Sequence, residues 1–370
     1  MVTRRKVLQS GAAAFAAGIV PSTAFTLTRK RSLKDIVKGR TFDFEVHLND
    51  RELYTNTDTP DIVPVPAERL DSVLDSWGWR NDEPGYADNR KRLERYLERS
   101  SIELKTEFLL NELTEAGIDT GIHQMVDHSV MPSSIGRHYI AGFDRMMEDA
   151  MRIRDQNPGR LITMAGIDPR SGAIDAVRRF EIAINDYGCK GLGEVVLQQF
   201  EIYPHDRSLY PLYEKCIEFN VPFIGNCEGP APYTMPKEFE QVAKDFPDLK
   251  ICLAGSGRPR RSSVANAPMA DAIRLGNEYE NIYLGIAASQ RRDKAGIEMY
   301  LGFLRRCFDS DAKGKVMYGS DFPVAVGAYH ARDWVDVVLN RAHEFGFSFS
   351  DEEITRFFSQ NTLAFLKDVL

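Results

Sequence analysis

Short apolar runs recur along the chain and are separated mostly by longer amphipathic stretches. Each run is continuously apolar, as in parallel strands whose two faces are both covered. Eight such runs, alternating with helical patterns, predict an α/β fold of the (β/α)8 or TIM-barrel type. The runs span residues 42–46, 120–126, 161–167, 191–197, 222–226, 251–254, 282–285 and 316–320.

The stretches between the runs carry helix signals. After Pro236, four apolar residues recur at the spacing of one helical face, and a similar stripe is ended by Gly117. Ser350 and Glu353 have the spacing of a capping box, which predicts a helix start near the C-terminus. The two stripes are Phe239, Val242, Ala243 and Phe246, and Leu109, Leu110, Leu113 and Ala116.

The N-terminus has the pattern of an export signal. Residues 3–9 read TRRKVLQ, similar to the twin-arginine motif, and an apolar run follows over residues 11–20. This run is too short to cross a bilayer as a helix, so we expect no stable membrane insertion. Small residues at 22–24 predict cleavage after Ala24. The twin-arginine machinery would then deliver the protein to the periplasm or outside the cell; a disordered tail or a retained anchor is the alternative.

The expected organisation is a signal peptide (1–24), a linker (25–40) and a barrel (41–370). An insertion of about 48–105 separates the first strand from the second, far longer than an ordinary strand-to-helix loop. Long loops at this face of a barrel often act as lids or bind substrate. Surface decoration is the alternative.

The composition is that of a soluble globular protein, with 43% hydrophobic residues and a net charge of -7 over 370 residues. The acidic balance argues against a nucleic-acid partner and leaves a small-molecule substrate as the expected one. Five cysteines, an odd number without CxxC spacing, predict buried free thiols rather than a zinc-thiolate site.

Functional residues of barrel enzymes cluster at the C-terminal ends of the strands. Glu45 and His47 are two residues apart at the end of the first run, so both should point towards the barrel axis. The other strand-end candidates are Glu194 in the fourth run, Asn226 in the fifth with Glu228 just beyond it, Arg258 after the sixth, and Asp321 after the eighth.

These strand ends and the sequence between them resemble the amidohydrolase superfamily, in particular its amidohydrolase-2 branch of metal-dependent hydrolases and decarboxylases. The resemblance covers nearly the whole chain after the signal. It is closest at residues 319–323 (GSDFP). Residues 109–120, 209–214 (LYPLYE), 220–222 (NVP), 246–250 (FPDLK) and 352–365 are also similar to the family.

The resemblance implies a metal set of His-x-His on strand one, His on strands five and six, and Asp on strand eight. This chain has Glu45-x-His47 on strand one, as decarboxylase-like members do, and Asn226 and Gly255 at the next two positions. The remaining donors are Glu45, His47, Glu194, Asp321 and, weakly, Asn226. This oxygen-rich set suits Mn²⁺, Mg²⁺ or Fe²⁺ better than Zn²⁺. The loss of two imidazoles leaves metal-bound and metal-free alternatives open.

A metal held there would activate a water molecule, with Asp321 as proton carrier and His47 and Glu194 in supporting catalytic roles. Without a metal, these carboxylates and His47 form an acid–base cluster. Arg258 would bind a substrate carboxylate, and His123, Glu228 and His205 are further substrate-binding candidates. We expect His128 at the surface.

The predicted function is hydrolysis of a C–N or C–O bond in a small cyclic or carboxylate substrate by an exported enzyme. Decarboxylation of an aromatic or unsaturated acid is the first alternative. A metal-free member that binds a ligand or serves as an accessory protein is the second. The resemblance also makes a homo-oligomer reasonable.

Overall fold

A computed structural model describes residues 30–48, 67–76, 78–98, 101–134, 136, 138–227, 232–257, 267–287, 291–323 and 329–370. The eight strands of these residues are β1 (Phe42–Val46), β2 (Thr120–Gln124), β3 (Leu161–Met164), β4 (Leu192–Val195), β5 (Phe223–Asn226), β6 (Ile251–Ala254), β7 (Ile282–Ile286) and β8 (Val316–Tyr318).

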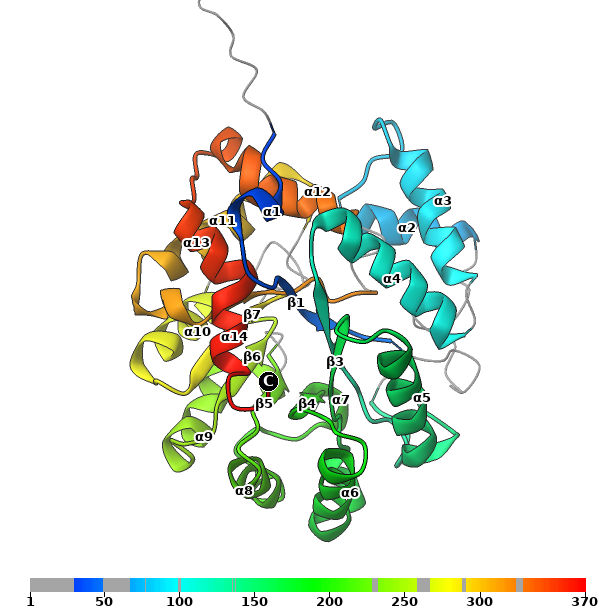
Figure 1. Cartoon of the computed structure of the whole chain (residues 1–370), viewed down its shortest axis with the longest axis vertical. Coiled ribbons are helices and arrows are strands. Elements are labelled where there is room, and N and C mark those ends of the chain that lie inside the picture. Colours follow the sequence, from blue (N-terminus) through cyan, green and yellow to red (C-terminus); the bar gives the residue numbers. More distant parts are fainter. Residues whose placement is uncertain are drawn as a thin grey trace, which may run out of the picture. The chain divides into compact units, whose positions relative to one another are not determined.

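The strands form a closed parallel barrel. They pair in the orders β1-β2-β3 and β4-β5-β6-β7-β8. Two single bridges join these groups, Ala165 with Leu192 and Val46 with Phe322. Helices surround the strands (Figure 1). The predicted (β/α)8 architecture is confirmed, with several strands shorter at their C-terminal ends than the apolar runs, because the chain leaves the ladder there to form the loops of the barrel mouth.

The helices follow the sequence signals closely. Ser350 and Glu353 form the predicted capping box, and Gly117 ends its helix in the left-handed conformation at φ 76°. None of the helices in the described residues combines the length and the apolar character needed to cross a membrane. The helices are α1 (Leu33–Ile36), α2 (Ala67–Ser76), α3 (Tyr86–Leu97), α4 (Ile102–Ala116), α5 (Gly142–Gln156), α6 (Ala173–Asn185), α7 (Leu197–Phe200), α8 (Tyr210–Glu218), α9 (Glu240–Asp245), α10 (Ala267–Glu278), α11 (Lys294–Phe308), α12 (Ala331–Asp336), α13 (Asp351–Thr355) and α14 (Asn361–Phe365).

Apolar side chains fill the inside of the barrel and close the end formed by the N-terminal ends of its strands. Phe44 and Ile224 belong to a cluster inside the strands that also includes Phe365 of α14. The rings of Phe44 and Phe365 pack edge to face at 5.8 Å. Lys250, just before β6, donates to the carbonyl oxygen of Phe365, so α14 covers the N-terminal ends of the strands. Polar chemistry is therefore confined to the opposite end.

The segment before β1 differs from the predicted linker. Residues from Arg31 onwards belong to the same compact unit as the barrel. Leu33 and Val37 are buried, α1 starts with a capping box, and Arg31 pairs with Asp351. The linker assignment is thus wrong for residues 31–40, because this stretch carries two apolar anchors among its charges. The predicted signal, residues 1–24, lies outside the described residues.

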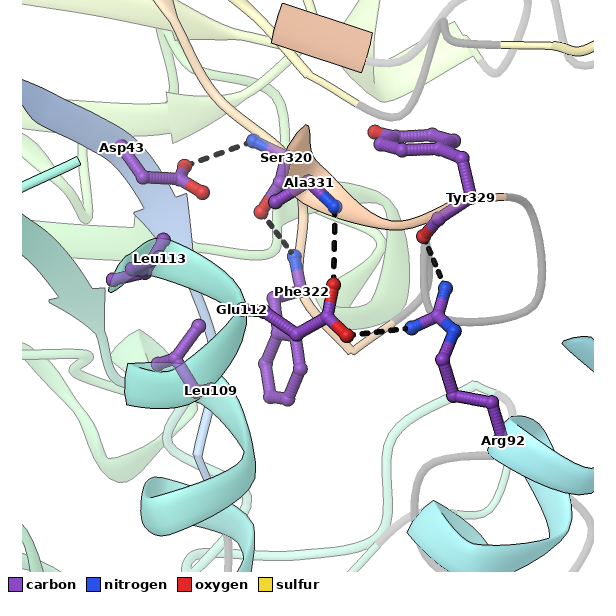
Figure 2. Close-up of a pocket in the computed structure, with 9 residues that line it drawn as sticks. All are labelled: Asp43, Arg92, Leu109, Glu112, Leu113, Ser320, Phe322, Tyr329 and Ala331. Atoms are coloured by element: carbon purple, nitrogen blue, oxygen red, sulfur yellow. Dashed lines mark hydrogen bonds and ion pairs between the residues drawn. The ribbon is translucent and has the colours of Figure 1, made fainter. Parts of the chain in front are cut away.

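The insertion after β1 contains α2 and α3 in its described part, and α3 is held to the barrel by a buried cation. Arg92 of α3 is 3% exposed; it pairs with Glu112 of α4 and donates to the carbonyl oxygen of Tyr329 (Figure 2). Glu112 also accepts hydrogen bonds from His330 and from the amide of Ala331. This part of the insertion is therefore attached beside the loop that follows β8.

Candidate active site

Strand β1 carries a β-bulge. It has one residue more between Asp43 and Val46 than β2 has opposite them. Phe44 packs inside the barrel, and a Cβ added to Gly319, directly after β8, would lie 3.0 Å from the Cβ of Glu45. Two consecutive residues therefore face the axis, and Val46 packs outside. Bulges of this kind often re-aim a side chain beside an active site.

Strand β4 has a matching irregularity. Its register against β5 shifts between Leu192 and Val195, the stretch that contains Gly193 and Glu194. Gly193 has φ 144°, and a Cβ there would lie 2.6 Å from the Cβ of Ile224, so only glycine fits. The carboxylate of Glu194 turns inwards and accepts a hydrogen bond of 2.7 Å from Nδ2 of Asn226.

Four of the predicted residues meet at the C-terminal ends of β1, β4 and β8. The ligand-type atoms of Glu45, His47 and Glu194 all lie within 4.8 Å of one another. Nε2 of His47 is 3.3 Å from Oδ1 of Asp321 and 3.6 Å from Oε2 of Glu194. The three carboxylates are buried, and the His47 side chain is 11% exposed. This arrangement forms an acidic cluster around one imidazole, and we call it the carboxylate cluster.

The orientation of His47 is set by β2. Its Nδ1 lies 2.8 Å from the carbonyl oxygen of Gln124, which can only accept, so Nδ1 carries a proton and Nε2 faces the carboxylates. Burial lowers the pKa of His47, but the hydrogen bond to Asp321 and the charges of Glu194 and Asp321 outweigh it and raise the pKa to about 9. Without a metal ion, His47 is therefore cationic at neutral pH and partly balances the cluster.

Asp321 reaches the cluster through an unusual backbone conformation. Its φ is 55°, in the left-handed region that Asp and Asn tolerate better than other residues with side chains. Its amide donates to the carbonyl oxygen of Glu45 at 2.9 Å. The chain thus turns back towards β1 directly after β8, which presents the carboxylate to His47.

The other histidine predictions have mixed outcomes. His123 is 1% exposed, close enough to His47 for their charges to interact, and its Nε2 lies 3.2 Å from the carbonyl oxygen of Leu48. His205 is 40% exposed on its side chain and pairs with Glu238, outside the cluster. His128 is buried against Phe200, so its expected surface position is wrong. The start of the loop after β2 folds inwards and buries this imidazole.

Two predicted substrate-binding residues, Glu228 and Arg258, lie outside the described residues. Asn226, predicted as a weak metal ligand, has an additional role as the hydrogen-bond donor to Glu194. Its Nδ2 holds Glu194, while its Oδ1 is buried without a hydrogen-bond partner among the described residues. Gly255 has φ 82° and offers no side chain at the sixth strand end.

Sequence reasoning missed the residues that support the cluster. Asp43 is fully buried on the outer face of β1. Burial raises its pKa to about 7, against the opposing hydrogen bonds from Ser320 and Glu45. Gln124, on β2, donates from Nε2 to the carbonyl oxygen of Phe44 at 2.7 Å. Their only sequence signal was a polar residue within an apolar run, two positions before Glu45 and four positions after Thr120.

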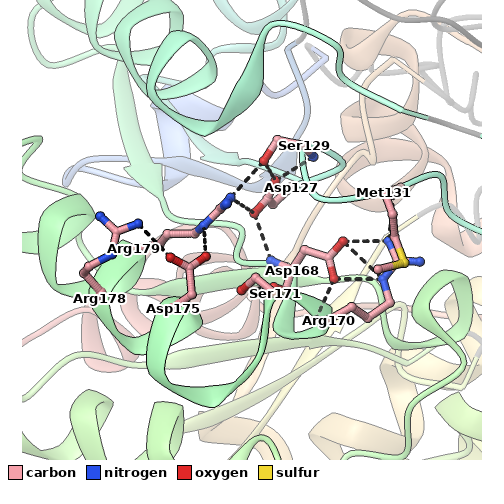
Figure 3. A network of polar contacts seen from close by, with 9 residues as sticks. All are labelled: Asp127, Ser129, Met131, Asp168, Arg170, Ser171, Asp175, Arg178 and Arg179. Carbon is pink, nitrogen blue, oxygen red and sulfur yellow. Dashed lines mark hydrogen bonds and ion pairs between the residues drawn. The ribbon is translucent and has the colours of Figure 1, made fainter.

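A second missed feature is a polar network that joins the ends of β2 and β3 (Figure 3). Asp127 accepts hydrogen bonds from Ser129 and from the amide of Asp168. The carboxylate of Asp168 pairs with Arg170, which also donates to the carbonyl oxygen of Met131. These groups are engaged with one another, so the network fixes two loops at the rim of the barrel mouth.

Comparisons with known proteins identify the family of the chain. Residues 111–367 match the sequence profile of a family described as Amidohydrolase. The chain belongs to this family. The match runs from α4 to α14 and includes Glu194, Asn226 and Asp321, whereas Glu45 and His47 precede it. No protein with a curated description matches this chain in sequence.

Solved structures share the fold at low sequence identity. An amidohydrolase from Burkholderia multivorans with bound zinc has a TM-score of 0.57 at 12% identity, covering 89% of this chain and 99% of that chain. A 5-carboxyvanillate decarboxylase from Novosphingobium aromaticivorans, complexed with manganese and 4-hydroxy-3-methoxy-5-nitrobenzoic acid, has 0.55 at 16%, covering 89% and 96%. A probable 2-pyrone-4,6-dicarboxylic acid hydrolase from Acinetobacter baumannii with citric acid bound has 0.55 at 11%, covering 89% and 100%. They show that the chain has the same (β/α)8-barrel fold as these proteins.

The buried His123 predicts a specific acid sensitivity. Burial, together with the charge of His47, lowers its pKa to about 4 from an ordinary value of 6.5. Between these values the unfolded chain binds a proton that the folded chain does not, so stability is complete above about pH 6.5 and falls as the pH drops towards 4. The loss is on the order of 3 kcal/mol. Urea denaturation of His123→Asn from pH 4 to pH 7 should therefore show a flatter pH dependence than the parent.

The matched control is His205→Asn, which removes an exposed histidine and should leave the slope unchanged. An unaltered slope in His123→Asn would show that other groups cause the acid sensitivity.

Proposed function

We propose that this protein is a divalent-metal-dependent hydrolase that cleaves a C–N or C–O bond in a small cyclic or carboxylate substrate. The observation that carries the proposal is the meeting of Glu45, His47, Glu194 and Asp321 at the barrel mouth. Two separate register shifts, in β1 and β4, are associated with the inward carboxylates. Buried carboxylates are costly unless they are paired or coordinate a cation, which supports a function for them.

The residues present fit a divalent cation. Glu45, His47 and Glu194 would hold it, because their ligand-type atoms lie close together and Nδ1 of His47 is already fixed by Gln124. The buried Oδ1 of Asn226, which has no hydrogen-bond partner in the described part of the chain, is an additional neutral donor. Carboxylate oxygens with one imidazole favour Mn²⁺, Mg²⁺ or Fe²⁺ over Zn²⁺. A bound ion would polarise the substrate and acidify a water molecule.

The protein's own groups would then move the proton. Oδ1 of Asp321, next to Nε2 of His47, would accept a proton from the attacking water and return it to the leaving group. Asn226 would keep Glu194 in place through its amide nitrogen. The low exposure of these side chains limits access of bulk water, which strengthens each electrostatic contact.

Decarboxylation of an aromatic or unsaturated acid is the second candidate. One observation favours it, namely that a glutamate stands at the first position of Glu45-x-His47, as in the decarboxylase-like members that the sequence resembles. His47, whose pKa is raised to about 9, would supply the proton to the carbon that loses carboxylate. The two reactions differ in their products, because only decarboxylation releases carbon dioxide.

We further propose that the chain is exported by the twin-arginine route, which carries folded proteins. The motif at residues 3–9 supports this, and so do the five cysteines, which are buried and free as a reducing cytoplasm would leave them. Replacing Arg4 and Arg5 together by Lys should retain the full-length protein inside cells, whereas the parent should appear shortened in the periplasmic or extracellular fraction on an immunoblot. Lys30→Arg is a suitable control, and equal export of both variants would contradict the route.

Metal binding should depend on pH. A cation must displace the proton that His47 holds below about pH 9, so the apparent affinity for Mn²⁺ should rise about tenfold per pH unit between pH 6.5 and 8.5. Isothermal titration calorimetry of the metal-stripped protein measures this slope, and thermal unfolding should shift upwards with added Mn²⁺.

Glu45→Gln should weaken Mn²⁺ binding at every pH, whereas Asp206→Asn, on the loop after α7, should not. No metal in the purified protein and no thermal shift with Mn²⁺ or Zn²⁺ would favour the metal-free ligand-binding alternative.

Asp321→Asn separates proton transfer from folding. Asparagine tolerates a φ of 55°, and its backbone amide can still donate a hydrogen bond to the carbonyl oxygen of Glu45. The variant should therefore fold like the parent. Turnover of a substrate found among lactones, cyclic amides and aromatic acids should fall by about 10²- to 10⁴-fold. Incorporation of ¹⁸O from water or release of carbon dioxide identifies the reaction.

Asp309→Asn, at the C-terminal end of α11, is the matched control and should retain full turnover. Unchanged activity in Asp321→Asn would remove Asp321 from the mechanism.

A further inference from the structure

The barrel closes where β1 meets β8, and this seam has almost no regular strand pairing. β8 contains only Val316–Tyr318, and the bridge that closes the barrel pairs Val46 of β1 with Phe322, which lies beyond the end of β8. Beyond β8, the amide of His47 donates to the carbonyl oxygen of Phe322, and the amide of Asp321 donates to that of Glu45. Two site residues therefore lie on a junction that ordinary ladder bonds do not complete.

The carboxylate of Asp43 supplies the missing acceptor. Its Oδ1 accepts a hydrogen bond of 2.9 Å from the amide of Ser320 and one of 3.2 Å from the amide of Glu45. A bulge leaves backbone groups without a strand partner, and a buried amide must find one elsewhere. One oxygen atom thus accepts hydrogen bonds from both sides of the seam. One donor immediately precedes Asp321, and the other is the amide of Glu45.

Two backbone carbonyl groups of the bulge also find hydrogen-bond donors that are not part of the strand ladder. The carbonyl oxygen of Phe44 accepts from the side chain of Gln124, and the carbonyl oxygen of Glu45 accepts from Asp321. These two bonds connect the bulge to Asp321 of the site and to Gln124, whose carbonyl oxygen orients His47. The position of Glu45 relative to Asp321 depends on this small set of contacts.

We propose that Asp43 is a positioning residue that fixes the distance between Glu45 and Asp321, because one oxygen of its carboxylate accepts hydrogen bonds from the amide of Glu45 and from the amide of Ser320, the residue before Asp321. It touches neither substrate nor metal, because it lies on the outer face of β1, towards Leu109 and Leu113 of α4 (Figure 2). The inference rests on the proposed function for its effect on binding, but its structural part stands independently.

The surroundings explain how a carboxylate is tolerated there. Asp43 lines a cavity of about 20 Å³, together with Arg92, Glu112 and Tyr329. This volume has room for about one water molecule. Oδ2 of Asp43 is buried and has no hydrogen-bond partner among the described residues, so Oδ1 carries the bonds to the seam. An ionised acceptor forms stronger bonds to amides than a neutral one.

The test combines hydrogen exchange with Mn²⁺ titration on the full-length, metal-stripped protein. Asp43→Ala removes the shared acceptor, and Asp43→Asn keeps an oxygen at the same place without the charge. Glu112→Gln is the control, because it alters a carboxylate on the same cavity that does not bond the seam. Exchange is followed by mass spectrometry in peptides covering residues 42–47 and 316–322.

In Asp43→Ala, exchange should accelerate at least tenfold in those two peptides and Mn²⁺ affinity should fall about 10- to 100-fold, as expected for loss of an outer support of a metal ligand. In Asp43→Asn, the affinity for Mn²⁺ should stay within about threefold of the parent value, and exchange should be faster only in the same two peptides. This variant tests the proposal if Asp43→Ala does not fold.

Unchanged exchange in both variants, or acceleration spread evenly over the barrel, overturns the positioning role. If the parent itself binds no Mn²⁺, the proposed metal function fails, while the exchange data still decide the role of Asp43.

Discussion

The hydrogen bonds at the β1 bulge are the constraint on which the site depends. A regular β1 would continue the alternation of Phe42 and Phe44 and send Glu45 to the outer face. The additional residue turns Glu45 to the axis and restores Val46 to the outer core. This geometry requires partners for the backbone groups that leave the ladder, and Asp43, Gln124 and Asp321 provide them.

The second constraint is charge. Three carboxylates and one imidazole are gathered in a largely buried space, and like charges at such distances oppose one another strongly. Hydrogen bonding and attraction to these carboxylates raise the pKa of His47 to about 9 although burial acts in the other direction. A divalent cation would balance the same charge better than a proton on His47, and this links the electrostatics of the cluster to the function proposed for it.

The rest of the fold isolates this chemistry at one end. Apolar side chains and α14 fill and cover the N-terminal end of the barrel. At the other end, the network of Asp127, Asp168 and Arg170 fixes the loops after β2 and β3, and Arg92 holds α3 beside the segment after β8. Side-chain contacts therefore join the loops of the rim on these sides.

The sequence by itself determined the barrel, its eight strands and the strand ends where Glu45, His47, Glu194 and Asp321 stand, because buried parallel strands are continuously apolar and their ends carry polar residues. Only the tertiary structure decided that bulges in β1 and β4 turn the two glutamates inwards, that Asn226 supports Glu194, that His128 is buried, and that Asp43 joins β1 to β8. These features depend on register and on contacts between residues such as Asp43 and Ser320, 277 positions apart, which no local pattern records.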